Sequence, residues 1–133
     1  MESVVVDTDV VSFWFKGDTR AVGYRRHLIG KLLVIAFFSV AELDEWAVQR
    51  RWGAERRKRM ERHLQRFLFF PVDRQLCQIW ADVRESSRRA GRLITHADAW
   101  VAATALACGA SLVTHNSGDY QGVTGLSLIS EST

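Results

Sequence analysis

The sequence lacks the features that mark several large classes of protein. It has one proline and no Gly/Ser-rich or repetitive tract, so no stretch looks like a linker between domains. No apolar run approaches the roughly 20 residues of a membrane helix. The first ten residues, MESVVVDTDV, lack the basic region and cleavage site of a signal peptide. We therefore expect a cytoplasmic protein that makes no contact with a membrane.

Cysteine is also scarce. The two cysteines, Cys77 and Cys108, are too few for a disulfide framework. Neither has the C-x-x-C or His-x-His neighbours that a zinc site needs. We expect both thiols to be reduced and no zinc to be bound.

The residues that are present fit one globular domain. A chain of 133 residues, 47% of them hydrophobic, can bury a proper core, and we expect residues 1–133 to form a single domain. The net charge of +3 is modest, but the basic residues are unevenly spread. Eight of the 18 Lys and Arg residues lie between Arg50 and Arg66.

Short apolar runs alternate with helical patterns along the chain. The runs at 3–6, 32–35, 67–72, 111–114 and 126–129 predict strands. Helices are predicted at 8–15, 19–29, 39–52, 54–66, 73–90 and 95–108. Ser39 is the expected N-cap of the third helix, and Gly53 is expected to end it. This alternation predicts an α/β fold: a three-layer α/β/α domain with a central, mostly parallel sheet of four to five strands.

Acidic side chains follow the predicted strands. Asp7 leaves the first strand, Glu42 lies one turn into the helix after the second, and Asp119 follows the fourth. Asp98 is in the first turn of the helix before the fourth strand. Sites in open α/β sheets form outside the carboxyl ends of the strands, so these four acids are predicted to converge. Four carboxylates repel one another unless they share a cation, and hard oxygen ligands suit Mg²⁺ or Mn²⁺. Such a cluster suits metal-assisted hydrolysis of a phosphodiester.

Each acid also has a purely structural interpretation. Thr95-x-x-Asp98 and Ser39-x-x-Glu42 both fit a capping box. Asp7 and Asp119 fit turn or N-cap positions. Neither interpretation excludes the other, because a capping residue can also bind a metal.

Four motifs, in order, resemble the PIN-domain family, specifically the VapC-like toxins of bacterial toxin–antitoxin pairs. They are VVVDTDVVS, SVAELDEWA, DAWVAATALACG and LVTHNSGDY, and together they span nearly the whole chain. The resemblance implies a metal-dependent endoribonuclease that cuts structured RNA, commonly tRNA or ribosomal RNA. It also implies a homodimer, inhibition by a small cognate antitoxin, and a heterotetramer or larger assembly with that antitoxin.

The resemblance also implies roles for particular residues. Asp7, Glu42, Asp98 and Asp119 match the four family acids and are the expected catalytic residues. Among them Asp7, Asp98 and Asp119 are expected to bind Mg²⁺ or Mn²⁺, and Glu42 to orient or deprotonate the attacking water or to help hold a second ion. The expected supporting polar residues are Thr8, Thr114 and Asn116.

Three residues depart from the family pattern. Asp9 stands where Asn or Ser is commoner, His115 where Arg is frequent, and Tyr120 where Phe is frequent. These departures leave the four acids in place and bear on the preference for RNA.

Two further groups suggest partner surfaces. Lys58, Arg62 and Arg66 fall opposite the apolar stripe of their helix and form either a solvated face or, with His115, contacts to RNA phosphates. A groove for the antitoxin is the other prediction, lined by Trp14, Trp46 and Trp52. The alternative for these three tryptophans is core packing.

Two other classes of function compete with the nuclease. A signalling receiver domain also places acids at strand ends, but it needs a lysine after the last strand, and the last lysine here is Lys58. A non-catalytic PIN-like module that binds RNA or sequesters an antitoxin is the other alternative. The presence of all four acids argues against it.

Overall fold

The computed structural model describes residues 1–132, which contain a five-stranded sheet in the order β3-β2-β1-β4-β5. The strands are β1 (Ser3–Val6), β2 (Leu32–Ala36), β3 (Leu68–Phe70), β4 (Ser111–Val113) and β5 (Leu128–Ile129). All four strand pairs are parallel; Val5, for example, pairs with Val34 on one side and Leu112 on the other. The predicted parallel α/β sheet is confirmed, with β1 at its centre.

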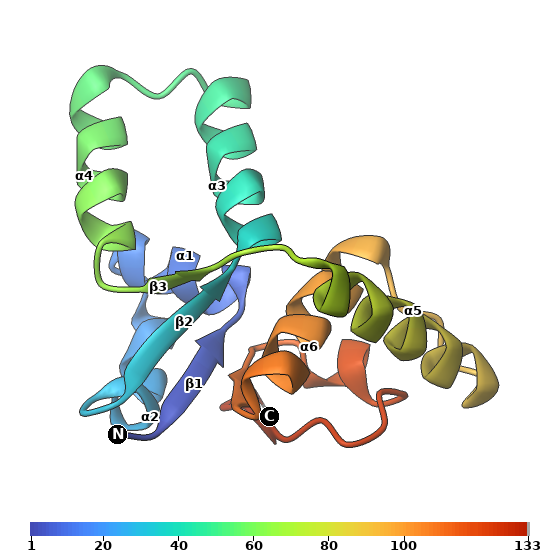
Figure 1. Cartoon of the computed structure of the whole chain (residues 1–133). Helices are drawn as coiled ribbons and strands as arrows, with labels where there is room; N and C mark the ends of the chain where they lie inside the picture. The colour runs from blue at the N-terminus through green and yellow to red at the C-terminus, as the bar shows by residue number, and fades with distance from the viewer. Residues whose placement is uncertain (133) are drawn as a thin grey trace.

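Helices cover both faces of this sheet (Figure 1). The α-helices are α1 (Thr8–Lys16), α2 (Arg25–Leu28), α3 (Phe37–Gln49), α4 (Ala54–Leu64), α5 (Arg74–Arg89) and α6 (His96–Cys108). Two short 3₁₀ helices are η1 (Thr19–Tyr24) and η2 (Ser117–Tyr120). In Figure 1, α3 and α4 form a hairpin that projects from the sheet. No helix within residues 1–132 is both long and apolar enough to span a membrane.

The alternation of side chains along β1 explains the two covering layers. Val4 and Val6 pack with residues of α1, α3 and α4 on one face, whereas Val5 packs with α5 and α6 on the other. All three valines are fully buried. Because both faces are covered, the strands are continuous apolar runs rather than alternating ones. The predicted three-layer α/β/α architecture is therefore confirmed.

The predicted boundaries of the third helix are wrong. The helix α3 begins at Phe37, directly after the strand, and its N-cap is Ala36, which has no capping side chain. The expected cap, Ser39, is instead buried inside the first turn. The helix ends at Gln49, before Arg51, whose φ of 52° is left-handed. Gly53 is the N-cap of the next helix, α4, rather than the end of α3.

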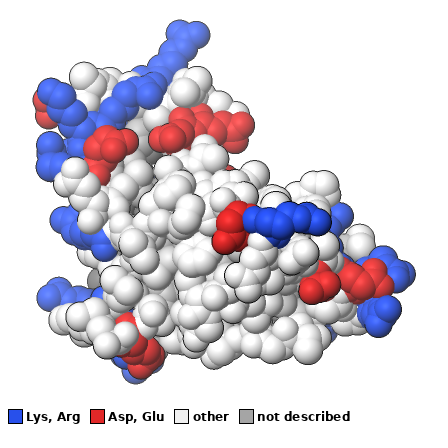
Figure 2. Space-filling view, in the orientation of Figure 1, with Lys and Arg blue, Asp and Glu red and all other residues white. Residues whose placement is uncertain are grey.

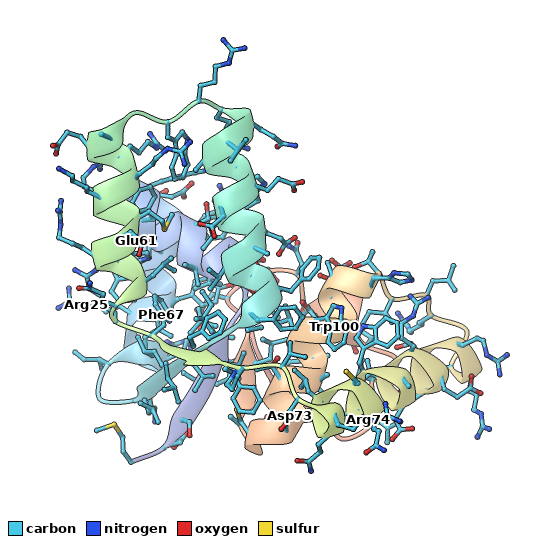
Figure 3. The ribbon with its side chains drawn as sticks, turned by 45° about the horizontal axis from the view of Figure 1, so that its top comes forward. Arg25, Glu61, Phe67, Asp73, Arg74 and Trp100 are labelled. Atoms are coloured by element: carbon cyan, nitrogen blue, oxygen red, sulfur yellow. The ribbon has the colours of Figure 1, made fainter. Side chains whose placement is uncertain are left out.

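Two other predicted elements differ in detail. The helix predicted over 19–29 is a 3₁₀ helix followed by one short α-turn. Gly23 lies in the middle of this stretch and lowers its α-helical propensity. The strand predicted over 67–72 is reduced to the three residues of β3. The next helix, α5, begins after Asp73, which is labelled in Figure 3. The Asp73 side chain caps α5 by accepting a hydrogen bond from the Leu76 amide at 2.8 Å.

Candidate metal and catalytic site

The site lies where the strand order of the sheet reverses, beside β1. From β1 the chain first builds β2 and β3 on one side and then crosses to β4 and β5 on the other. Asp7 follows β1 and Thr114 follows β4, so both leave neighbouring strands at their carboxyl ends. The backbone amide of Asp7 donates to the carbonyl oxygen of Val113 at 2.9 Å, which fixes the two segments against each other. Ligands bind at such switch points in open α/β sheets.

Asp7 is the most deeply placed acid of this site, with only 7% of its surface exposed. Its Oδ1 accepts a hydrogen bond from the Thr8 amide at 2.7 Å, so Asp7 is the N-cap of α1. Its Oδ2 accepts two more, from the hydroxyls of Thr114 and Tyr120, each at 2.8 Å. Burial and then the charge of Asp9 raise the pKa of Asp7 to about 7, against the lowering effect of these donors. The capping interpretation is therefore correct for Asp7, but the cap lies inside an acidic site.

Asp98 also combines a capping position with a place in the site. Its backbone amide donates to Thr95 Oγ1 at 3.1 Å, so Thr95 is the predicted N-cap of α6. Its carboxylate Oδ1 is 3.3 Å from the hydroxyl of Tyr120, the same hydroxyl that contacts Asp7. Burial, and then the charge of Asp119, raise the pKa of Asp98. One tyrosine oxygen thus separates Asp7 from Asp98.

Glu42 enters the site from α3. Its Oε1 accepts a hydrogen bond from the Thr8 hydroxyl at 2.8 Å, and the Ser39 hydroxyl is 2.7 Å from the same Thr8 oxygen. Ser39 therefore contributes to the position of Thr8 and not to a capping box, which explains why the predicted cap was wrong. Burial raises the pKa of Glu42, and the charges of Asp7 and Asp98 raise it further.

Asp9 belongs to the site although it lay outside the predicted catalytic set. Its Oδ2 accepts hydrogen bonds from the amide of His115 at 3.1 Å and from the side-chain amide of Asn116 at 2.9 Å. Burial raises the pKa of Asp9, and the charge of Asp98 adds to the effect. The side-chain amide of Asn116 thus holds the Asp9 carboxylate in place. Asp119 is exposed, and its clearest link to the cluster is the effect of its charge on Asp98.

The cluster carries negative charge that nearby cations do not balance. Within residues 1–132 no Lys, Arg or His side chain forms an ion pair with any of its acids, namely Asp7, Asp9, Glu42, Asp98 and Asp119. As the side chains lie, no three His, Cys, Asp or Glu residues of the described chain are placed to hold a metal ion together. The acids therefore affect one another's pKa values without forming a closed coordination site.

Tyr120 was noted in the sequence only as a departure from the family pattern. The structure places it in the site, 1% exposed and with its hydroxyl on two acids. Burial, followed by the charges of Asp7 and Asp98, raises the pKa of Tyr120. Its position next to Asp119 in the sequence was the available signal for this role.

The predicted RNA-contacting residues lie on the projecting hairpin. Lys58, Arg62 and Arg66 are exposed on or just after α4, and Figure 2 shows Lys and Arg side chains crowding this part of the surface, with Asp and Glu beside them. Arg66 is partly engaged already, because its guanidinium lies 5.5 Å from the ring of Trp14. The His115 Nδ1 is 2.6 Å from the hydroxyl of the buried Tyr24, so one edge of that ring faces inward.

The three tryptophans predicted to line an antitoxin groove are partly buried against the core of the α1–α3–α4 face. Trp52 stacks on Phe15 with 5.6 Å between the ring centroids. The guanidinium carbon of Arg50 lies 5.2 Å from the centre of the Trp46 ring. Phe67, labelled at the base of α4 in Figure 3, packs against Trp14 at 5.8 Å. Their surroundings match the alternative of core packing. Trp14 alone of the three lines the groove of about 600 Å³ beside α1, η1 and α2.

The fold and the site define a class: a small parallel α/β/α domain whose switch point carries a cluster of carboxylates. Residues 4–122 match the family model described as PIN domain, and the chain belongs to the PIN-domain family. Among curated proteins it is similar to Ribonuclease VapC1 of Haemophilus influenzae, with 26% identity over 124 residues and 92% of each chain covered.

Solved structures of similar fold agree with this assignment. One is VapBC2 from Rickettsia felis bound to a DNA fragment from its promoter, with a TM-score of 0.84, 17% identity, and 96% of this chain and 97% of that chain covered. Another is VapBC-1 from nontypeable Haemophilus influenzae, with a TM-score of 0.76, 23% identity and 96% of both chains covered. At these identities the likeness bears on the fold.

Proposed function

We propose that this chain is a ribonuclease toxin that cuts structured cellular RNA, tRNA or ribosomal RNA, with the help of Mg²⁺ or Mn²⁺. The observation that carries the proposal is the acidic cluster at the switch point, where Asp7 and Asp98 share one hydroxyl and no ion pair within the described chain offsets their charge. The VapC1 relative is named a ribonuclease, which supports the same activity here.

The donor set fits a hard divalent cation. The side chains that would hold it, Asp7, Asp98 and Asp119, offer only carboxylate oxygens, which Mg²⁺ and Mn²⁺ prefer. Burial, and then the charge of a neighbouring acid, raises the pKa of both Asp7 and Asp98, and a positive ion beside them would stabilise the charged carboxylates that burial and repulsion disfavour. When bound, a divalent ion lowers the pKa of water and stabilises charge on a phosphate.

The chain's own residues supply the remaining chemistry. In this proposal Glu42 orients the attacking water and accepts its proton, and the hydrogen bond from the Thr8 hydroxyl supports the role by fixing its carboxylate. A raised pKa suits this role, because a general base works best when its pKa approaches the working pH. Asn116 keeps Asp9 turned toward the backbone of His115, which limits how far that acid can move.

The proposed partners rest on the similarity of this chain to VapC proteins. We propose a small cognate antitoxin as the inhibitor, a homodimer as the active unit and a heterotetramer or larger assembly as the inhibited form. The VapBC complexes of similar fold support an antitoxin partner. The exposed Lys58, Arg62 and Arg66, with His115 nearer the acids, are the proposed contacts to RNA phosphates. The groove that Trp14 lines is the proposed site for a segment of the antitoxin.

The test is RNA cleavage with and without added Mn²⁺, in the parent and in Asp98→Asn. The matched control is Asp82→Asn, which removes an exposed carboxylate from α5, away from the cluster. We expect cleavage by the parent and the control only with the ion, and none above background by Asp98→Asn. If Asp98→Asn cuts RNA as the parent does, the alternative of a non-catalytic PIN-like module with a contaminating nuclease replaces the proposal.

A further inference from the structure

The hydroxyl of Tyr120 occupies the space between the two acids nearest the centre of the site. Its oxygen is 2.8 Å from Asp7 Oδ2 and 3.3 Å from Asp98 Oδ1. A tyrosine hydroxyl has one hydrogen, which it donates to Asp7 at the shorter distance. The same oxygen lies close to Asp98. Tyr120 is 1% exposed, so its hydroxyl meets these two acids rather than solvent. The carboxylate oxygens that face each other are thus separated by one donor.

The Asp7 oxygen at this point is already saturated. Its Oδ2 accepts from both Thr114 and Tyr120, and a carboxylate oxygen has two lone pairs. A cation that binds Oδ2 must therefore displace one of the two hydroxyls. Thr114 is the better anchored, because its oxygen also accepts a hydrogen bond from the Asn116 amide at 3.1 Å. The Tyr120 hydroxyl is the one that also lies close to Asp98, so it is the one that would give way if both acids held an ion.

We infer that Tyr120 is a positioning residue that holds Asp7 and Asp98 in the ion-free protein and is displaced from Asp7 when the two acids take up a divalent ion. The inference rests on the proposed function, because it concerns the same metal site. It also explains why no three acidic side chains of the described chain are grouped to hold an ion as they lie. The tyrosine hydroxyl lies between the two central acids and fills an acceptor position of Asp7 Oδ2.

This role has an energetic consequence. A hydrogen bond to a charged group stabilises the ion-free state, and the ion must overcome that stabilisation when it binds. Removing the hydroxyl therefore weakens the ion-free fold and strengthens ion binding. A purely structural tyrosine would give the first effect without the second.

The experiment is a titration of the purified protein with Mn²⁺, without RNA, in the parent and in Tyr120→Phe. The matched control is Tyr24→Phe, because Tyr24 is also fully buried and its hydroxyl contacts His115, Glu131 and the carbonyl oxygen of Thr114 rather than Asp7 or Asp98. We expect Tyr120→Phe to bind Mn²⁺ about tenfold more tightly than the parent, which corresponds to about 1.4 kcal/mol. Its ion-free melting temperature should be lower. The control should keep the parent's affinity.

A second measurement needs no variant at position 120. The chain has two tyrosines, so Tyr120 is the only one left in Tyr24→Phe. With tyrosine labelled at the carbon that bears the hydroxyl, the chemical shift of that single carbon reports its hydrogen bonding. We expect saturation with Mg²⁺ to move this signal, and a signal that stays in place as Mg²⁺ binds would overturn the inference.

The outcomes separate this inference from the proposed function. If the parent binds Mn²⁺ and Tyr120→Phe binds it no more tightly, Tyr120 is not displaced and the metal site stands without it. If neither protein binds Mn²⁺, the inference and the metal dependence of the proposed function both fail. If only Tyr120→Phe binds, the hydroxyl is a stronger competitor than we expect, and the inference is supported.

Discussion

Replacing Asp7 with asparagine should change the pH dependence of stability in the ion-free protein. Burial and the Asp9 charge raise the pKa of Asp7 from 3.8 to about 7 in the folded state. The folded protein therefore binds the proton more tightly than the unfolded chain does. This contribution to stability is fully present below about pH 4 and is lost as the pH rises through about 7. Each pKa unit is worth about 1.4 kcal/mol, so the loss is about 4 kcal/mol.

In Asp7→Asn this pH-dependent loss disappears. The amide accepts from the Thr8 backbone as the carboxylate does, but it presents hydrogens to the hydroxyls of Thr114 and Tyr120, at a cost of about 1 kcal/mol. We expect the variant to be about 1 kcal/mol less stable than the parent near pH 4 and about 3 kcal/mol more stable near pH 8. The stability difference should thus change sign.

Chemical denaturation in a chelating buffer, at both pH values, measures this difference. The control is Asp82→Asn, which should stay within about 0.5 kcal/mol of the parent at both, since the side chain is exposed on α5. If the difference in free energy of unfolding between Asp7→Asn and the parent is the same at both pH values, the pKa of Asp7 is not raised by folding and the reasoning is refuted.

Three further predictions concern the ion, the base and the RNA surface. Mn²⁺ should raise the melting temperature of the parent near pH 8 but not that of Asp98→Asn, since a ligand stabilises only the state that binds it; equal shifts in thermal melts would contradict this. Thr8→Val should lower the rate constant of RNA cleavage at saturating substrate about tenfold, because Glu42 loses its hydrogen bond at 2.8 Å. Thr8→Ser keeps the hydroxyl and should retain most of the parent's rate constant; equal rates for the two variants would refute the role of Thr8. Arg62→Glu should weaken RNA binding and reduce the slope of log affinity against log salt by about 0.7 or more, as measured by fluorescence anisotropy; an unchanged slope would leave Arg62 on a solvated face.

The sequence predicted the fold well because the strands are local and strongly apolar. The run at 3–6 is a strand with those boundaries, and the alternation of strands and helices was enough for the layers. The start of α3 was predicted wrongly because a serine at position 39 can either cap a helix or form a hydrogen bond with a distant residue. Capping is a local interaction that can be read from neighbouring residues, whereas the Ser39 contact with Thr8 joins positions 31 apart.

The same distinction applies to the site. The topology predicted which acids would lie near the switch point, and the charges of Asp7 and Asp98 do raise the pKa of Glu42 after burial has raised it. The hydrogen bonds among them could not be predicted, since Tyr120 reaches Asp7 across 113 positions. Asp9 was similarly undervalued, because its partner Asn116 is 107 positions away. Such contacts depend on side-chain geometry that strand order alone does not fix.

The pairing of β1 with β4 has a consequence for the newly made chain. It joins the start of the protein to residues 111–113, and Thr114 and Tyr120 complete the site only after that pairing. Contacts so distant in sequence are the slowest to form. At about 5–20 residues per second, a ribosome spends on the order of ten seconds before these residues exist. A growing chain therefore cannot assemble the acidic cluster before residue 120 has been made, and Asp7 lacks both of its hydroxyl donors throughout that interval.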